Sequence, residues 1–392
     1  MKNYKNLFPI FKNNPTLHYL DSGATALKPQ VVLDKMMEYY TSYSANIHRG
    51  LYPMSERATR EYEEVRNKVA KFIGAKHEAE IIFTSGTTDS INLVARGLGL
   101  KKEDEVVVEI EAHHSNFVVW QQMGKITNYE LYPNGHRQIT NKTRILAITH
   151  VSNVLGVVNN IKETIKKARE INPDIIVVVD GAQAIPHIPV NVADLDCDFY
   201  AFSGHKMYGP TGVGVLYARV NRQSEMSPAR YGGGMIKEVF EENSTWADGP
   251  ERFEAGTPPI AQVIGLGAAI DFINKIGFDE IQRHEAEVTK YLFEKLAELK
   301  WIKIVGSGYD KNRLGVVAIA VDNIGAHDMA DILGRKYNVA VRAGHHCTMP
   351  LHTRLGLPYG TTRISLGIYN DKSDIDELIN GLIEAWTIFT KN

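Results

Sequence analysis

Residues 175 to 180 read IIVVVD, an apolar and mostly β-branched run in which polar and apolar positions do not alternate. Such a run is expected of a strand buried on both faces, as in the parallel sheet of an α/β fold. Ligands of open α/β folds bind beyond the carboxyl ends of the strands. The run therefore predicts an α/β fold and places Asp180 at the ligand-binding edge, where a buried carboxylate needs a cationic partner.

A lysine follows the next apolar stretch. Ser203-Gly204-His205-Lys206 comes after residues 199–202 and before the turn sequence GPTG. Small neighbours leave Lys206 open to close approach, so its amine can react with an aldehyde, and Ser203 and His205 can donate to a phosphate. With Asp180 as partner of a protonated pyridine nitrogen, this is the layout of a pyridoxal 5'-phosphate (PLP) site. Taken singly, Asp180 could be a helix or turn cap and Lys206 a solvated surface residue.

Three stretches carry a resemblance to a known family: VVVDGAQAIPH, LDCDFYAFSGHKMYGPTGVGVLY and VRAGHHCTMPL. They resemble the cysteine desulfurases of the class-V aminotransferase fold, and most closely the group-II branch of SUF-type cysteine desulfurases and selenocysteine lyases. The similarity runs from about residue 17 to the C-terminal helix. It implies a PLP-dependent transferase of fold type I, with a large α/β domain around a mostly parallel sheet and a smaller α+β C-terminal domain.

The expected organisation is an N-terminal arm at residues 1–16, a large PLP-binding domain at 17–258 and a small domain at 259–392 that carries the cysteine loop. The pattern turns helical from Pro258. In the large domain, one helix is expected from about Pro29 to Tyr43. A second helix follows, with Ser55 as its cap and Gly74 as its end.

Two further stretches predict cofactor contacts. EIIFTSGTTDSINLVARGLG reads as strand, glycine turn and helix, so Thr87 and Thr88 lie at a helix N-terminus that can bind phosphate. Helix capping alone would also explain these threonines. EVVVEIEAHHSNFVVW predicts a strand that ends in His113 and His114.

The resemblance assigns roles to three more side chains. It implies that His113 stacks on the pyridine ring and that Gln183 donates to the phenolic oxygen of the cofactor. It also implies that Thr257 reaches the phosphate held by a neighbouring subunit. A homodimer with shared active sites follows as an expectation.

The chain has two cysteines, which implies no disulfide framework. Cys197 lies in an apolar stretch and is expected to be a buried packing thiol. Cys347 is expected in a loop between strands, after His345 and His346 and within five residues of Arg342. Cationic neighbours raise the thiolate fraction of a cysteine. Two alternatives stay open, namely an inert loop cysteine and a zinc site made with His352, although adjacent loop residues rarely converge on a metal.

The substrate side is predicted from an arginine on a strand and an amide at a strand end. Arg363, in TTRISLG, suits bidentate capture of a carboxylate, and Asn153 is a short amide donor. The resemblance implies that Arg363 holds the substrate carboxylate, that Asn153 faces the substrate or the ring oxygen, and that His48 lies near the mouth of the site. Arg342 is expected to bind substrate as well. A surface ion pair and an Asx turn are the structural alternatives.

These residues predict conversion of L-cysteine to L-alanine, with Cys347, Lys206 and His113 as catalytic residues. Lys206 or another base removes the Cα proton, His113 moves protons, and Cys347 becomes a persulfide that passes sulfur to an acceptor protein. A SUF-type acceptor, iron-sulfur cluster assembly and L-selenocysteine as a second substrate are further expectations. The rivals are another class-V PLP enzyme, such as an aminotransferase or kynureninase, and a non-catalytic sulfur-transfer scaffold.

A net charge of −2 and a pI near 6.7 give no electrostatic case for nucleic acid or for an anionic membrane. No stretch approaches the ~20 apolar residues of a membrane span, and the N-terminus lacks a signal-peptide core, so a cytoplasmic location is expected. No metal is expected. Thr348 stands where the resembled branch usually has alanine, which puts the hydrogen bonding of the cysteine loop in question.

Overall fold

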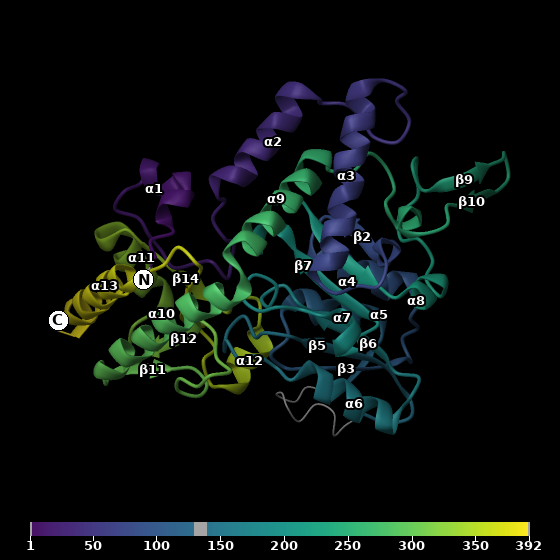
Figure 1. The fold of residues 1–392 in the computed structure, drawn as a ribbon. Coiled ribbons are helices and arrows are strands. Elements are labelled where there is room, and N and C mark those ends of the chain that lie inside the picture. Colours follow the sequence, from purple (N-terminus) through teal and green to yellow (C-terminus); the bar gives the residue numbers. More distant parts are fainter. Residues whose placement is uncertain (1, 129–138, 391–392) are drawn as a thin grey trace. The chain divides into compact units, whose positions relative to one another are not determined.

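The computed structural model describes residues 2–128 and 139–390 (Figure 1). The chain forms two compact units made of separate segments. Unit 1 is Met1–Gln30, Val151–Asn159 and Ile276–Asn392, and unit 2 is Val31–His150 and Asn160–Lys275. This division differs from the three continuous segments expected from the sequence, whose bounds stay a prediction. The first residue of the expected arm and the last two of the small domain lie outside the described residues.

Unit 2 is built on a seven-stranded sheet with the order β2-β8-β7-β6-β5-β3-β4, in which β8 runs antiparallel to both its neighbours and the other pairs are parallel. Residues 176–180 form β6 and are all buried, as the apolar run predicts. The mostly parallel sheet confirms the expected α/β fold. The strands are β2 (Ile81–Thr84), β3 (Glu105–Val108), β4 (Lys125–Asn128), β5 (Thr143–Thr149), β6 (Ile176–Asp180), β7 (Phe199–Ser203) and β8 (Gly214–Ala218).

The helices of unit 2 bury their apolar stripes. In α3, Ala58, Tyr62 and Val69 are fully buried at helical spacing. Both predicted early helices exist, but Ser55 is not a cap, because the helix already begins at Pro53 and the Ser55 hydroxyl donates to the Asn46 carbonyl at 2.7 Å. The helices are α2 (Gln30–Ser42), α3 (Pro53–Phe72), α4 (Thr87–Gly97), α5 (Val118–Met123), α6 (Ile161–Ile171), α7 (Val192–Leu195), α8 (Val220–Ser224) and α9 (Ile260–Ile276).

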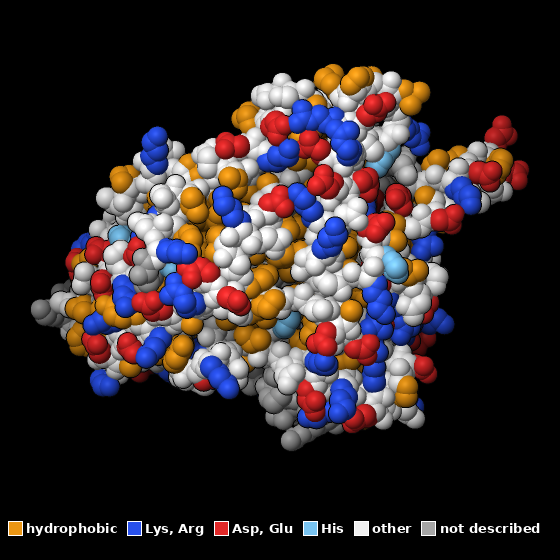
Figure 2. All heavy atoms as spheres, in the orientation of Figure 1, with side chains coloured by type: hydrophobic (Ala, Val, Ile, Leu, Met, Phe, Trp, Pro, Cys, Tyr) orange, Lys and Arg blue, Asp and Glu red, His pale blue; other side chains and the backbone are white. Residues whose placement is uncertain are grey.

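Residues 219–257 contain a two-stranded hairpin, β9 (Ile236–Val239) and β10 (Ser244–Trp246). In Figure 1 it extends away from the sheet of unit 2. Figure 2 shows acidic side chains gathered on and beside this hairpin, where Glu238, Glu241, Glu242 and Asp248 are exposed.

Unit 1 has an antiparallel sheet with the order β11-β12-β15-β14 and a short parallel pair, β1-β13. Its core joins the sheet to its helices through apolar side chains such as Ile319, Ile364 and Leu378. The strands are β1 (His18–Tyr19), β11 (Ile302–Ile304), β12 (Val316–Val321), β13 (Val339–Ala340), β14 (Arg342–Gly344) and β15 (Thr361–Ser365). The helices are α1 (Pro9–Asn13), α10 (Phe278–Glu298), α11 (Ala326–Tyr337), α12 (Met349–Arg354) and α13 (Lys372–Thr390).

Among the described residues, none of the helices is by itself long and apolar enough to cross a membrane. The consecutive helices α9 and α10 reach that length and composition only when taken together, across a sharp bend.

Candidate active site

Asp180 and Lys206 follow neighbouring strands of unit 2. Asp180 ends β6, and Lys206 lies in the 3-10 turn Gly204–Lys206 directly after β7. Because these strands are parallel, with Asp180 opposite Ala201, both residues lie at the same edge of the sheet. Burial raises the pKa of the Asp180 carboxyl, while the Ala182 backbone N–H, 3.0 Å from Oδ1, and the charge of Lys206 lower it. The edge therefore holds a buried carboxylate that a further cation would stabilise.

Two hydroxyls predicted to bind phosphate contact each other at this edge. Ser203 Oγ accepts from the Thr87 backbone N–H at 2.8 Å and lies 2.7 Å from Thr87 Oγ1. Thr87 is the first residue of α4, so the hydroxyls lie at a helix N-terminus, where an anion is favoured. Thr88 Oγ1 pairs with Ser115 Oγ at 2.7 Å.

The turn before α4 is shaped by two glycines. Gly86 has a φ of +156°, and a Cβ on Gly214 would lie 2.4 Å from the Gly86 Cα. This close approach lets β8 pass directly beneath the helix N-terminus. The predicted strand, turn and helix are thus confirmed, and the geometry suits an anion.

Gln183 and His205, two further residues of the predicted cofactor site, lie in the same unit. Gln183 is 4 % exposed, and its Oε1 has no hydrogen-bond partner among the described residues. Buried amides normally find a partner, so this oxygen has room for a donor, whereas the predicted donation to the phenolic oxygen would come from the amide nitrogen. His205 is half-buried in the turn that carries Lys206.

His113 does not end a strand as predicted, because β3 stops at Val108. Instead, His113 caps the 3-10 turn His114–Asn116, and its Nδ1 accepts from the Ser115 backbone N–H at 3.1 Å. In the neutral ring the proton is therefore on Nε2. The residue still follows β3 at the carboxyl edge of the sheet.

Sequence reasoning missed a buried pair next to Asp180. His150 Nδ1 lies 2.9 Å from the Tyr200 hydroxyl, and burial lowers the pKa of His150 to about 4. A Cβ on Gly181 would lie 2.1 Å from the Tyr200 ring. A glycine directly after the strand-end aspartate was the signal that an aromatic ring packs there.

Sequence reasoning also missed a buried carboxylic acid. Glu109, directly after β3, is 2 % exposed, and burial together with the charge of Glu111 raises its pKa. Its Oε2 accepts from the Thr149 backbone N–H at 2.9 Å, at the end of β5.

In unit 1, Cys347 lies in the loop between β14 and α12. The guanidinium of Arg342 donates to its Sγ at 3.5 Å. The prediction that His346 is a cationic neighbour of the thiol is wrong, because burial, with the charge of Arg363, lowers the pKa of that imidazole to about 2 and keeps it neutral. Arg342 is therefore the cationic side chain whose contact with the Cys347 thiol the structure shows.

The cysteine loop is held by buried side chains. His346 Nε2 and His352 Nε2 lie 2.9 and 3.0 Å from the same atom, Thr361 Oγ1. The Thr348 hydroxyl donates to the His345 carbonyl at 2.8 Å, so the threonine in place of alanine adds a hydrogen bond within the loop. Within residues 2–128 and 139–390, no group of three His, Cys, Asp or Glu side chains is arranged to hold a metal.

Arg363 lies on β15, as predicted, and is 1 % exposed. Its Nη2 pairs with Asp21 Oδ1 at 2.9 Å, and its Nη1 donates to the Asn153 carbonyl at 3.2 Å. Its Nε has no hydrogen-bond partner among the described residues. The guanidinium thus keeps a donor for an acceptor such as a carboxylate.

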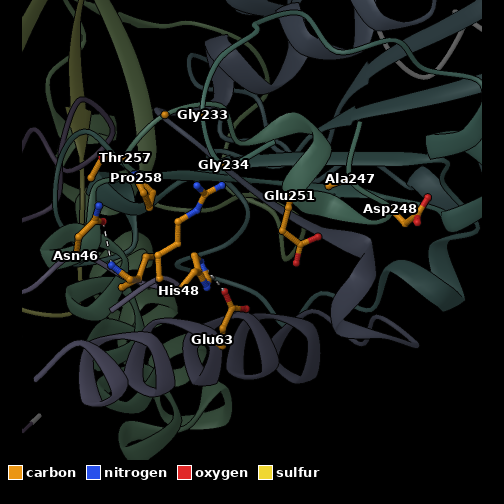
Figure 3. A pocket seen from close by; sticks show the side chains of 13 residues that line it. Asn46, His48, Glu63, Gly233, Gly234, Ala247, Asp248, Glu251, Thr257 and Pro258 are labelled. Atoms are coloured by element: carbon orange, nitrogen blue, oxygen red, sulfur yellow. Dashed lines mark hydrogen bonds and ion pairs between the residues drawn. The ribbon is translucent and has the colours of Figure 1, made fainter. Parts of the chain in front are cut away.

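The remaining predicted residues, His48 and Thr257, line one cavity of about 820 Å³ in unit 2. Figure 3 shows His48 turned toward Glu63, whose Oε1 lies 3.6 Å from Nε2, with Thr257 and Pro258 at the wall. Lys206 and Asp180 do not line this cavity. The predicted substrate residue His48 and the predicted phosphate residue Thr257 therefore line a cavity to which Asp180 and Lys206 do not contribute.

Cys197 is fully buried, and burial raises the pKa of its thiol far above the ordinary range. This confirms the expected packing role.

The sequence model of the class-V aminotransferase family matches residues 18–378 of the chain. The chain is 44 % identical to a probable cysteine desulfurase of Halalkalibacterium halodurans, over 96 % of each chain. It is 42 % identical to a cysteine desulfurase of Haloferax volcanii, over 95 % of this chain and 90 % of the relative. Among solved structures, it is similar to the cysteine desulfurase of Thermococcus onnurineus, with a TM-score of 0.91, 38 % identity and 98 % of each chain covered. The cysteine desulfurase CsdA of Escherichia coli gives a TM-score of 0.89 and 35 % identity over 99 % of this chain and 98 % of that one.

Proposed function

Because the chain belongs to the class-V aminotransferase family, and within it to the cysteine desulfurases, we propose that it converts L-cysteine to L-alanine and takes the sulfur onto Cys347. The observation that supports this most directly is the contact between the Cys347 thiol and the Arg342 guanidinium. An aminotransferase or kynureninase reaction needs no such thiol.

PLP is the cofactor of this family, and the residues of unit 2 fit it. Asp180 is a buried carboxylate in need of a cation, and Lys206 stands at the same edge. The hydroxyls of Ser203 and Thr87 meet at a helix N-terminus. When bound, PLP supplies an aldehyde for amines and an electron sink for the substrate carbon atoms.

The chain's own residues then have distinct tasks. Asp180 holds a proton on the pyridine nitrogen, and the Lys206 amine holds the cofactor and takes the proton from the substrate Cα. His113 moves protons through Nε2. The phosphate is bound by Ser203, Thr87, Thr88 and His205.

The thiol chemistry belongs to unit 1. The Arg363 guanidinium binds the substrate carboxylate through its remaining donor, and the Cys347 thiolate attacks the substrate sulfur. The Cβ–S bond breaks, its electron pair stays with the carbon side, and Cβ takes a proton to give L-alanine. The new S–S bond leaves a persulfide on Cys347, which an acceptor protein consumes.

A homodimer is part of this proposal. Thr257 and His48 line a cavity apart from Lys206, as expected if they serve the site of a second copy. Apolar side chains are exposed on α2, before α3 and in its first turn, including Met37, Tyr40, Leu51, Tyr52 and Met54. Figure 2 shows hydrophobic surface at the outer end of these helices. Such a patch on one chain is typical of an interface.

The finer expectations rest on the resemblance. They are sulfur transfer to a SUF-type acceptor for iron-sulfur cluster assembly, action on L-selenocysteine, and a cytoplasmic location. For selenocysteine, the weaker C–Se bond lessens the need for Cys347.

The test measures the visible absorbance of the PLP-loaded protein and then L-alanine and sulfide formed from L-cysteine under a reductant. Lys206→Ala should abolish both the cofactor linkage and turnover, whereas Cys347→Ser should keep the cofactor and lose sulfide release. Cys197→Ser is the matched control and should release sulfide at the parental rate. If Cys347→Ser also did so, the persulfide role would be wrong.

A further inference from the structure

The ion pair of Arg363 depends on a carboxylate that precedes an irregular segment of unit 1. Asp21 forms an isolated parallel bridge with Ser365, whereas Arg363 lies within the regular strand β15. Residues 22–24 form a turn, and residues 25–29 have no regular secondary structure. The position of the Asp21 carboxylate therefore depends on the contacts of the segment that follows it, residues 22–27, which we call the 22–27 loop.

The 22–27 loop packs directly against the guanidinium of Arg363. A Cβ on Gly23 would lie 3.1 Å from Arg363 Cζ, closer than side chains normally approach. The Gly23 backbone N–H donates to the Oγ of Ser365, two positions after Arg363 on β15, at 2.8 Å. A shift of this loop would thus move both the charge partner of Arg363 and the backbone beside its guanidinium.

The hydroxyl of Tyr369 joins the two ends of the 22–27 loop. Its oxygen lies 2.7 Å from Ser22 Oγ and accepts from the Leu27 backbone N–H at 3.3 Å. Because these two partners are the first and last residues of the loop, one oxygen atom closes it. Burial raises the pKa of Tyr369 far above the ordinary range, so the phenol stays neutral and keeps its proton.

The ring of Tyr369 is itself held in place. It is 1 % exposed, and the centroids of the Phe8 and Phe11 rings lie 4.8 and 5.7 Å from its own. These rings, the 22–27 loop and Arg363 all belong to unit 1. A packed ring thus presents its hydroxyl to the loop, and the loop lies against Arg363.

We propose that Tyr369 is a positioning residue for the substrate-carboxylate site, because its hydroxyl fixes the 22–27 loop and the loop fixes Asp21 against Arg363. The inference rests on the proposed role of Arg363. Tyr369 acts through Ser22 and Asp21 rather than through a contact with substrate. Since the carboxylate is held both before and during the reaction, a displaced Arg363 weakens substrate binding more than it slows the chemical step.

The experiment compares the PLP-loaded full chain with its Tyr369→Phe variant, which removes one oxygen atom and keeps the packing of the ring. Deuterium uptake is followed at the Gly23 amide, which bonds to Ser365 and so reports on the loop rather than on the deleted bond. This amide should exchange about tenfold faster in the variant. The KM for L-cysteine should rise about fivefold, with kcat changed less than about twofold.

Ser22→Ala removes the other partner of the 2.7 Å contact and should also raise the KM. The double variant should have the KM of Tyr369→Phe alone, because both substitutions break the same contact. Effects of the two substitutions that multiply in the double variant would overturn the proposed link through Ser22.

The matched control is Tyr4→Phe. Tyr4 is also a buried tyrosine of unit 1, and its hydroxyl donates to Glu280 Oε1 at 2.8 Å, away from the 22–27 loop. Its loss should leave the KM and the exchange at Gly23 at their parental values. An unchanged KM in Tyr369→Phe would overturn the proposal, as would equal changes in Tyr4→Phe. Since exchange needs no turnover, a parental protein that forms no alanine refutes the proposed function, and exchange at Gly23 still decides whether Tyr369 fixes the loop.

Discussion

Arg363 and Asp21 form an ion pair across 342 positions of the chain, with Nη2 and Oδ1 2.9 Å apart and the arginine side chain 1 % exposed. A buried guanidinium needs such compensation. Asp21 compensates the charge of the guanidinium, so the arginine stays charged. The Nε of Arg363 has no hydrogen-bond partner among the described residues, so the arginine can still bind an anion.

Arg363→Lys should therefore lower kcat/KM for L-cysteine by about 100-fold, mainly through a higher KM. An ammonium is a point charge and cannot bond to Asp21, Asn153 and a carboxylate in the fork geometry of a guanidinium. Steady-state alanine formation measures this. An unchanged KM would place the substrate carboxylate elsewhere.

Arg342→Gln should slow alkylation of Cys347 by iodoacetamide at pH 7 about fivefold, because the guanidinium 3.5 Å from Sγ stabilises negative charge on the attacking sulfur and glutamine carries no charge. Mass spectrometry of the labelled peptide separates Cys347 from the buried Cys197. Arg354→Gln, which removes a guanidinium at the end of α12, is the matched control and should alkylate at the parental rate. Equal rates in all three proteins would contradict a role for Arg342.

The His346 imidazole predicts an acid-sensitive stability. Its pKa lies at about 2 in the folded chain and near 6.5 when unfolded, so the unfolded state binds more protons as the pH falls. The contribution of the neutral His346 imidazole to the free energy of unfolding is fully present above pH 6.5 and is lost as the pH falls toward 2. About 2 kcal/mol of this contribution is lost by pH 5.

His346→Gln should remove this part of the pH dependence. Between pH 7 and pH 5, its free energy of unfolding should fall by about 2 kcal/mol less than that of the parent in urea denaturation. His150, whose pKa is also lowered by burial, contributes equally to both proteins and cancels. Parallel pH profiles would show that His346 is protonated in the folded chain.

Glu254→Gln should lower the free energy of unfolding by about 3 kcal/mol, because it leaves the guanidinium of Arg66 buried with less compensation. Arg66 is 2 % exposed and donates to both carboxylate oxygens of Glu254, at 2.7 and 3.0 Å. The exposed pair of Lys68 and Asp271, at 2.6 Å, is the control, and Asp271→Asn should cost less than about 1 kcal/mol. Similar losses in both variants would contradict the argument from burial.

Gly214→Ala should weaken PLP binding at least tenfold while the chain still folds. The new Cβ would lie 2.4 Å from the Gly86 Cα and would push β8 away from the start of α4. Titration of the apo protein with PLP, followed by absorbance, measures the affinity. Gly212→Ala is a local control, since no atom lies within 4 Å of its added Cβ, although its φ of +75° makes that variant mildly strained. Parental affinity in Gly214→Ala would show that the turn can give way.

The sequence allowed the sheet and its edge to be predicted because parallel strands put their carboxyl ends side by side. Their positions directly after apolar runs therefore predicted that Asp180, Lys206 and the threonines of α4 lie at this edge. The end of β3 was misjudged because Ile110 and Ala112 continue the apolar pattern after the backbone has left the sheet at Val108.

Other contacts leave no local signal. The partner of Arg363 lies 342 positions away, and the charge state of His346 depends on burial among residues from separate segments. A pair of adjacent histidines before a cysteine indicated cationic help for the thiol, yet tertiary packing decides their protonation. The sequence likewise indicated that the Asn153 amide is a donor, but it could not identify the carbonyl group that accepts from it, that of His346 at 2.7 Å.

Unit 1 takes its first thirty residues from the start of the chain and its last strand and helix from the end. On the ribosome, Asp21 and Asn153 are made long before Arg363, and neither can bond to the arginine until residue 363 has been synthesised. The unit that carries the thiol is thus expected to complete its fold last, after the sheet of unit 2 is available. A chain without this last part of unit 1 would then carry the predicted PLP-binding residues of unit 2 but no folded Cys347 loop, so reactive sulfur would form only after unit 1 has folded.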